Sequence, residues 1–258
     1  MNKVFKRSSI LGVRVDAVSL NELISYIVYK VQLHEKAIIT NVNVHAVNIA
    51  YKVSWFRDFI NNSQVVFCDG YGIKWAVNFL NRIKLYRLTP PDWFGNLAAK
   101  CVTDGYSLFL LGSTQEVVDK AAAEMQRKYP LLRILGTHHG YFDKQVTSSE
   151  NKDVITRINA LNPDILMVGF GMPTQEKWIL ENWDELMTTV ILPVGALFDY
   201  LSGEVRRVPR WMTDHGLEWL GRMIIEPKRL WRRYLIGNPL FTWRIFKHHI
   251  LRFSLPSN

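Results

Sequence analysis

The chain alternates short apolar runs rich in β-forming residues with longer segments of helical spacing, and this alternation restricts its fold more than any other feature. Strands separated by helices build a parallel sheet that is covered on both faces. We therefore expect an α/β fold, Rossmann-like and doubly wound, with a mainly parallel sheet. The expected strands are Ile10–Val15, Ala37–Thr40, Gln64–Cys68, Ser107–Leu111, Arg133–Gly136, Asp164–Gly169 and Val190–Val194.

Three helix starts can be placed from local signals. Ser19 precedes a helical pattern, and Glu22 follows it at the spacing of a capping box. The turn 112–114 is expected to open a second helix, and Pro173 suits the first turn of a third, which carries Trp178.

Polar or glycine-rich turns follow five of the expected strands. Each turn is ordinary by itself, but ligands of parallel α/β sheets bind beyond the carboxyl ends of the strands. Together the turns predict a ligand site along one edge of the sheet. They are Asn41-Val42-Asn43, Asp69-Gly70, Gly112-Ser113, Gly171–Glu176 and Gly195. The sequence contains neither G-x-G-x-x-G nor G-x-x-x-x-G-K-[ST], which argues against a dinucleotide fold and a P-loop NTPase.

The chain from Glu204 onward is basic and rich in tryptophan. It holds eleven Lys and Arg against four Asp and Glu, whereas the whole chain has a net charge of +9. We expect an α/β catalytic core over residues 1–203 and a helical appendage over residues 204–258. A basic, aromatic appendage is suited to an anionic partner, which would be a lipid surface, a diphosphate or a nucleic acid.

Other features narrow the class of protein. Cys68 and Cys101 each lie in an apolar run, which favours inert buried thiols, and no histidine or cysteine spacing indicates zinc. The N-terminus does not read as a signal peptide, and no run of ~18 apolar residues is long enough to span a bilayer. The expected location is therefore the cytoplasm, with any membrane contact peripheral.

Several segments, in order along the chain, resemble the WecG/TagA/CpsF family of bacterial glycosyltransferases (glycosyltransferase family 26). The most specific are GxPxQExW at 171–178 and the block FDYLSGEVRRVP…GLEWLGR…EPKRLWRRY within 195–238. The resemblance extends from about residue 10 to residue 240. The other matching segments are NVNVHAVNIA at 41–50, VVFCDGYGIKWA at 65–76, RLTPPDWF at 87–94, FLLGSTQEVVDKAA at 109–122, HGYF at 139–142 and PDILMVGFG at 163–171.

The resemblance implies an inverting transfer of a sugar from a UDP-sugar to an undecaprenyl-diphosphate-linked saccharide, at the cytoplasmic face of the membrane and without a cofactor. Donors in the family include UDP-N-acetylmannosamine, its uronic acid, and sugars of the glucose or glucuronate type. The products belong to cell-surface polysaccharides. Which donor, acceptor and linkage apply to this chain is left open.

Such a transfer needs a base near the acceptor hydroxyl. Asp69 fits this role because it follows a buried strand, and because Gly70 and Gly72 leave room for a substrate. The family aspartate that it matches has been proposed as the base. The alternative is that Asp69 caps a helix beginning near Tyr71.

The departing diphosphate needs positive charge. Metal-dependent glycosyltransferases commonly carry an Asp-x-Asp pair, which this chain lacks, so no metal is expected. Arg222, Arg229 and Arg232 match arginines of the family's appendage, and guanidinium groups bind phosphate oxygens bidentately. Pro227 would divide helices over 214–226 and 228–235, so a bend must bring the arginines together. The alternative is a solvated basic face or contact with lipid headgroups, and it suits Arg206, Arg207 and Arg233 better.

Further substrate contacts follow from matching positions. Asn43 and Gln175 match polar residues of the family's pocket. Asn41 stands where several members have threonine, and Pro90-Pro91 stand where many have small residues or glycine. These two differences weaken any inference of the substrate of this chain from those of other members. Asp92 is a candidate for contact with the sugar.

Four more residues are candidates for binding the nucleotide. The ring of Tyr141 is suited to stack on uracil, and the carboxylate of Asp199 to accept hydrogen bonds from ribose. Gly112 and Gly195 give room for close approach to the backbone. The alternative for each is a turn or core packing.

The stretch from Leu235 to Leu255 mixes aromatic and apolar residues with Arg, Lys and His, as interfacial helices do. We expect it to contact an anionic membrane surface. Packing on the body or on a second subunit is the alternative, which leaves a homo-oligomer open. Two other functions are possible for such a sequence. A nucleic-acid-binding protein is disfavoured because no recognition module precedes the basic segment, and a non-catalytic scaffold of a polysaccharide assembly complex is disfavoured by the intact Asp69 and arginines.

Overall fold

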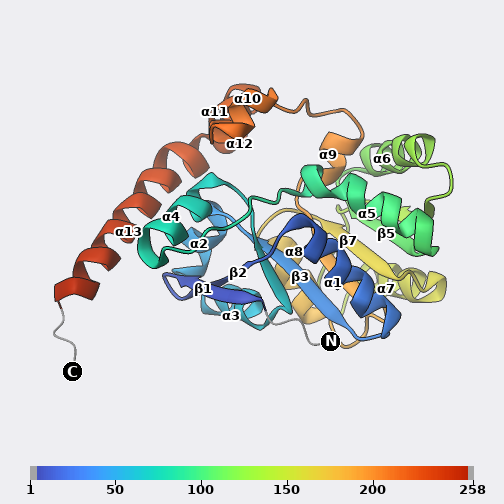
Figure 1. Ribbon diagram of the computed structural model, residues 1–258. Coiled ribbons are helices and arrows are strands. Elements are labelled where there is room, and N and C mark those ends of the chain that lie inside the picture. The colour runs from blue at the N-terminus through green and yellow to red at the C-terminus, as the bar shows by residue number, and fades with distance from the viewer. Residues whose placement is uncertain (1–4, 255–258) are drawn as a thin grey trace.

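The computed structural model describes residues 5–254, with side chains described to residue 251. Its centre is a six-stranded sheet of order β4-β3-β8-β7-β5-β6, in which every neighbouring pair is parallel. This arrangement confirms the expected Rossmann-like α/β fold (Figure 1). The strands are β3 Ala37–Val42, β4 Val65–Cys68, β5 Ser107–Gly112, β6 Arg133–His138, β7 Ile165–Gly169 and β8 Val190–Pro193.

Helices cover both faces of this sheet. The core-building helices are α1 Leu20–Gln32, α2 Val44–Ala50, α3 Ser54–Asn62, α4 Tyr71–Asn81, α5 Pro90–Asp104, α6 Gln115–Lys128, α7 Ser149–Leu161, α8 Thr174–Glu181 and α9 Leu197–Leu201. The helix starts at Ser19 and Thr114 are confirmed: Ser19 forms a capping box with Glu22, and Thr114 Oγ1 accepts from the Val117 amide. Pro173 is the N-cap of α8, one residue before the position expected for it.

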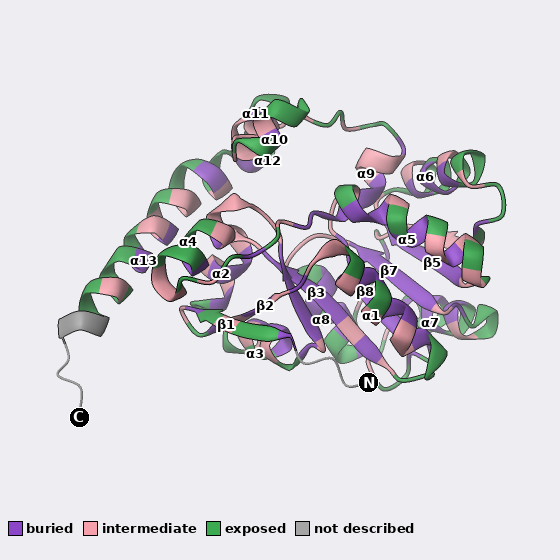
Figure 2. Ribbon diagram, viewed as in Figure 1, coloured by how far each residue is buried: buried purple, intermediate pink, exposed green. Residues whose placement is uncertain are grey.

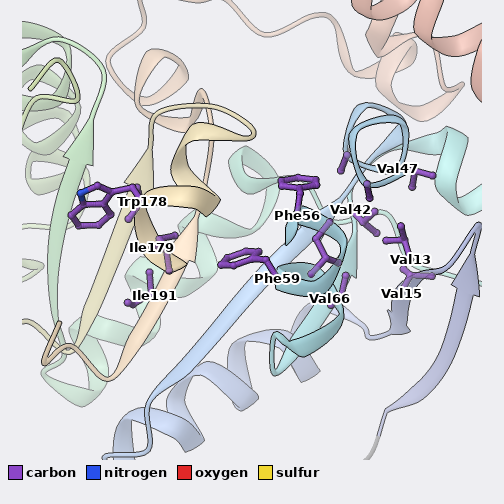
Figure 3. Packing of buried hydrophobic residues seen from close by; sticks show 14 of the residues in the cluster. Val13, Val15, Val42, Val47, Phe56, Phe59, Val66, Trp178, Ile179 and Ile191 are labelled. Atoms are coloured by element: carbon purple, nitrogen blue, oxygen red, sulfur yellow. The ribbon is translucent and has the colours of Figure 1, made fainter. Parts of the chain in front are cut away.

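Each face of the sheet has its own hydrophobic core. One core lies between the sheet and α2, α3, α7 and α8, and its packing is seen around Phe56, Phe59 and Trp178 in Figure 3. The other lies between the sheet and α1, α5, α6 and α9. The parallel strands are therefore largely buried while the outer faces of the helices are exposed (Figure 2). Burial on both faces explains why these strands read as continuous apolar runs.

The first expected strand was wrong. Instead of one strand over Ile10–Val15, the chain forms an antiparallel hairpin of β1 Lys6–Ile10 and β2 Val13–Ala17, apart from the parallel sheet. The turn is Leu11-Gly12, with φ values of 51° and 82°. Two positive φ angles define a tight hairpin turn whose twist suits the flanking strands. The side chains of Ile10, Val13 and Val15 are still buried, in the core that also contains α2, α3, α7 and α8.

The appendage consists of five consecutive helical segments. They are α10 Arg210–Asp214, α11 Glu218–Ile225, α12 Pro227–Trp231, the π-helical turn η1 Arg232–Ile236 and α13 Gly237–Ser254. The predicted break at Pro227 is confirmed, whereas the helix expected over 214–226 begins only at Glu218. In Figure 1, α10 to α12 lie above the carboxyl edge of the sheet and α13 descends beside α2 and α4.

The long helix α13 is held on the body by one of its faces. Phe241 and Ile245 are buried in the core that also contains α2, α3, α7 and α8. Arg244 donates to Asn48 Oδ1 at 2.7 Å, and its guanidinium lies over the ring of Tyr51. The open alternative of packing on the body therefore holds for this face. Its other face exposes the large side chains Trp243, Phe246, Ile250 and Leu251. Leu255, the end of the expected tail, lies outside the described residues. Across residues 5–254, no helix combines the length and apolar character needed to cross a bilayer.

Candidate active site

A cavity of about 760 Å³ opens at the carboxyl edge of the sheet, where the sequence predicted a ligand site. Its size is within the range of small-molecule and cofactor pockets. The turns after four adjacent strands, β4, β3, β8 and β7, supply its floor, and the appendage supplies the opposite wall. Of the predicted site residues, those that line it are Asn41, Asn43, Asp69, Gln175, Gly195, Arg222, Arg229 and Arg232.

Asp69 lies directly after β4 and is fixed by its neighbour Asn43. The Asn43 amide donates to Asp69 Oδ2 at 3.1 Å, while Asn43 Oδ1 caps α2 by accepting from the Ala46 amide at 3.0 Å. Helix α4 begins after Gly70, and its N-terminus has no side-chain cap. The helix-capping alternative for Asp69 is therefore not what the structure shows, and the carboxylate is left to face the cavity.

The electrostatics of Asp69 suit a base. Burial raises the pKa of Asp69 above its ordinary value, and the Asn43 amide together with Arg233 and Arg222 opposes this rise. A carboxylate with a raised pKa accepts a proton more readily. Burial, and secondly the charge of Asp69, raise the pKa of Glu218, which lines the same cavity from α11.

The arginines of the appendage converge as the resemblance implied, with one correction. Arg222, Arg229 and Arg232 line the cavity, and so does Arg233, for which the sequence favoured a solvated face or contact with lipid headgroups. Arg233 is half-buried, and its charge acts on Asp69. The exposed Arg229 is already paired with Glu226 at 2.7 Å. Arg233 and Arg222 are the two arginines of the appendage whose charges lower the pKa of Asp69.

Arg207 was also judged to suit a solvated face, and the structure gives it a partner on the body. It pairs with Asp92 at 2.5 Å, and Asp92 also pairs with Arg87 at 3.1 Å. Arg87 in turn pairs with Glu218 at 3.0 Å. Asp92 is thus part of a network that joins Arg87 and the first turn of α5 to the appendage, and it is not among the residues that line the cavity.

Asn41 has an unused acceptor. The side chain is 4% exposed, and its Nδ2 donates to the Pro193 carbonyl at 3.3 Å. Its Oδ1 is buried without a hydrogen-bond partner in the described structure. Buried polar atoms are usually paired, so this oxygen is suited to a hydroxyl or amide donor of a ligand in the cavity.

Gln175 is fully buried and joins two turns of the cavity edge. Its Oε1 accepts from the amides of Gly171 at 3.2 Å and Gly195 at 3.1 Å, and its Nε2 donates to Glu176 Oε1 at 2.8 Å. These bonds connect the turns after β7 and β8. Gln175 therefore holds the edge in shape, which the sequence had not indicated.

Glu176 is fully buried, and burial raises its pKa from 4.5 to about 7. The folded chain thus keeps a proton that the unfolded chain releases, so the free energy of unfolding should decrease as the pH rises from 4.5 to about 7. We expect Glu176→Gln to remove this decrease and to stabilise the protein above pH 7 by up to about 3 kcal/mol. Urea denaturation at several pH values measures it. The exposed Glu185→Gln is the control, and an equal pH dependence in wild type and Glu176→Gln would contradict the prediction.

Of the predicted nucleotide residues, Gly195 lines this cavity, whereas Gly112, Tyr141 and Asp199 do not. Ser113 Oγ donates to Asp199 at 2.8 Å, and Tyr141 is 76% exposed on the turn after β6. Gly112, with φ of 149°, approaches so closely that an added Cβ would lie 2.5 Å from the Gly169 carbonyl oxygen. Gly169 in turn lies against the Gly195 carbonyl and the ring of Phe198, so the turns after β5, β7 and β8 pack closely on one another.

His45 is a residue of the site that the sequence analysis did not single out, and the two cysteines can also be placed. His45 lines the cavity, and burial together with Arg233 lowers its pKa to about 4, so the ring is neutral near pH 7. Cys68 and Cys101 are free thiols and both are buried, as expected, and burial raises the pKa of each to about 12. Among residues 5–254 no three His, Cys, Asp or Glu side chains are grouped to hold a metal ion.

A parallel α/β sheet with a carboxylate at its edge and a wall of arginines is suited to an anionic ligand, and comparison with known proteins identifies the class of protein. Residues 8–254 match the glycosyl transferase WecG/TagA/CpsF family, and the chain belongs to it. The protein is therefore a glycosyltransferase.

The curated relatives cover nearly the whole chain. The N-acetylglucosaminyldiphosphoundecaprenol N-acetyl-beta-D-mannosaminyltransferase of Staphylococcus aureus (strain NCTC 8325 / PS 47) is 29% identical over 240 residues, which are 92% of this chain and 91% of the relative. The protein of the same description from strain MRSA252 is 28% identical over the same length.

Proposed function

We propose that the protein transfers a sugar, with inversion and without a metal ion, from a UDP-sugar to an undecaprenyl-diphosphate-linked saccharide of a bacterial surface polysaccharide. The observation that carries this proposal is the position of Asp69, a carboxylate of raised pKa inside a cavity whose opposite wall holds Arg222 and Arg233. Family membership and the printed activity of the staphylococcal relatives support it.

In the proposed step, Asp69 takes the proton of the acceptor hydroxyl while that oxygen bonds to the anomeric carbon of the donor. The bond from the anomeric carbon to the diphosphate breaks, and UDP leaves with the electron pair. Arg222, Arg229, Arg232 and Arg233 compensate the charge that develops on the diphosphate. Lys52, which lines the cavity from the connection between α2 and α3, adds to them.

The nucleotide is proposed to extend from Gly195, where an added Cβ would meet nothing within 4 Å, past the turn at Gly112. Uridine would then reach the ring of Tyr141 and the carboxylate of Asp199. The donor sugar would lie near Asn41 and Asn43, where the free Asn41 Oδ1 meets a hydroxyl or an N-acetyl N–H. UDP-sugars of the N-acetylmannosamine, N-acetylmannosaminuronate, glucose and glucuronate types all carry a hydroxyl or N–H group that can donate this hydrogen bond.

The appendage, residues 204–258, is proposed to complete the site on the core formed by residues 1–203 and to approach the membrane from the cytoplasmic side. The exposed apolar side chains of α13, together with Lys247 beside them, suit an anionic bilayer surface.

The proposal is tested with a panel of UDP-sugars and UDP. We expect UDP and the true donor to raise the melting temperature, and that donor alone to give product with a polyprenyl-diphosphate-linked saccharide in a buffer containing EDTA. If no uridine nucleotide raises the melting temperature, the proposed donor class is wrong. If EDTA abolishes transfer, the reaction requires a metal ion and the metal-free mechanism is wrong.

A further inference from the structure

A second cavity, of about 370 Å³, adjoins the first at the carboxylate. A reaction between two bound substrates requires both reacting atoms within about 3–3.5 Å of each other, so two cavities that meet at one base suit two substrates. The residues that line both are Asn43, His45, Asp69, Glu218, Arg222 and Arg233.

The two cavities differ in charge. The larger is lined by five Lys and Arg side chains against the carboxylates of Asp69 and Glu218, because Lys52, Arg229 and Arg232 add to the shared pair. The smaller has only the two shared arginines against the same two carboxylates. A nucleoside diphosphate is therefore favoured in the larger cavity, and a group of little charge in the smaller.

The walls of the smaller cavity are aromatic. Besides the shared residues, it is lined by Tyr71 and Trp75 of α4, Trp219 of α11 and Tyr234 of η1. Trp219 and Tyr234 are neighbours, with ring centroids 6.1 Å apart. Flat, amphipathic rings that also carry N–H and O–H groups suit the apolar face and the hydroxyls of a sugar ring.

The floor of this cavity gives access to the base. Gly70, the residue after Asp69, has φ of 106°, and an added Cβ there would meet nothing within 4 Å. The backbone next to the carboxylate is thus open toward the smaller cavity. Asp69 itself lines this cavity, so a hydroxyl bound there can approach its carboxylate.

The mouth of the smaller cavity leads onto an exposed apolar strip. Trp75, which lines the cavity and is 41% exposed, stacks on Phe79 with centroids 5.6 Å apart, and Phe79 contacts Phe246 of α13 at 5.7 Å. Ile250, four residues after Phe246 on α13, is also exposed. A sugar in the cavity would have its lipid chain directed along these side chains.

We propose that the smaller cavity is the acceptor subsite, which binds the saccharide of the polyprenyl-diphosphate-linked acceptor while the larger cavity holds the UDP-sugar. This inference rests on the proposed function, because it presumes a lipid-linked saccharide as the second substrate. It assigns the aromatic residues of α4, α11 and η1 to acceptor binding, beyond the arginines that serve the donor.

The test measures binding of two probes by calorimetry: UDP, and N-acetylglucosaminyl diphosphate carrying a short, water-soluble prenyl chain. The short chain removes any effect of membrane docking. Two variants alter only the smaller cavity: Trp219→Leu removes a wall, and Thr242→Phe fills the space from the surface of α13. Each is expected to weaken acceptor binding about tenfold or more while UDP binding changes less than twofold.

Two further variants complete the design. Lys52→Gln alters only the larger cavity and should weaken UDP binding while acceptor binding is retained. Trp211→Leu, which removes a 59% exposed tryptophan outside both cavities, should change neither. In wild type the two probes should bind together.

Competition between the acceptor probe and UDP would overturn the inference, as would unchanged acceptor binding in both Trp219→Leu and Thr242→Phe. These outcomes are distinct from failure of the proposed function. Absence of transfer from every UDP-sugar would refute that function, whereas selective loss of acceptor binding in the cavity variants would still support the subsite.

Discussion

Asp69→Asn is expected to lower the transfer rate by about 10²–10⁴-fold, the range that a positioned general base contributes. Asparagine keeps the shape of the side chain and can still pair with Asn43, which now donates to Asp69 Oδ2. It cannot accept the proton of the acceptor hydroxyl. The affinity for UDP should be nearly unchanged, because the cations of the larger cavity remain in place. Steady-state transfer assays and calorimetry with UDP measure the two quantities.

The matched control is Asp58→Asn, which changes an aspartate that is 63% exposed on α3 and should leave the rate unaltered. The pH profile gives a second check. Because burial raises the pKa of Asp69, activity of the wild type should be lost as the pH falls through that raised value, where the base becomes protonated. A non-catalytic scaffold would show no loss in Asp69→Asn, and this result would exclude the proposed mechanism.

The central sheet could be predicted from the sequence because of how it is buried. Its strands are covered on both faces, so runs such as Val65–Cys68 and Ile165–Gly169 are continuously apolar and end in recognisable turns. The hairpin at Lys6–Ala17 could not be separated in the same way. Its turn uses Leu11 at a positive φ, a residue that rarely marks such turns, and no Asn-Gly or Asp-Gly pair announces it.

The floor of the site was predictable for a related reason, since the carboxyl ends of parallel strands must meet at one edge. The wall was less so. Glu218 and Arg233 stand four residues from Arg222 and Arg229, a spacing that places side chains on one face of a helix. That spacing was the available signal for both. The second cavity had no such signal, because α4, α11 and η1 form it only when the appendage packs on the body.

The partners of Asp92 and Gln175 were likewise beyond the sequence. Position and residue type indicated contact with substrate for both. In the folded protein Asp92 pairs with Arg87 and Arg207, and Gln175 bridges two glycine amides. Polar side chains near a site compete for ligands and for neighbouring protein groups, and only the three-dimensional arrangement decides between them.

Arg222→Gln is expected to lower kcat by about 10²–10³-fold, the cost of removing one donor that stabilises charge in a transition state. Arg222 lines both cavities, and its charge acts on Asp69. Its Nε is buried without a hydrogen-bond partner in the described structure, so the guanidinium retains a donor for a phosphate oxygen. Glutamine retains part of the length and polarity but has no charge.

Comparison among the arginines makes this prediction specific. Arg233→Gln should cost nearly as much as Arg222→Gln, since both line both cavities, whereas Arg229→Gln should cost less because Glu226 already engages that guanidinium. Arg206→Gln changes an exposed arginine outside the cavities and serves as the control. A raised KM for the donor with unchanged kcat in Arg222→Gln would mean that this arginine binds ground state and transition state equally. The charge on the departing diphosphate would then have to be compensated by Arg233 and its neighbours.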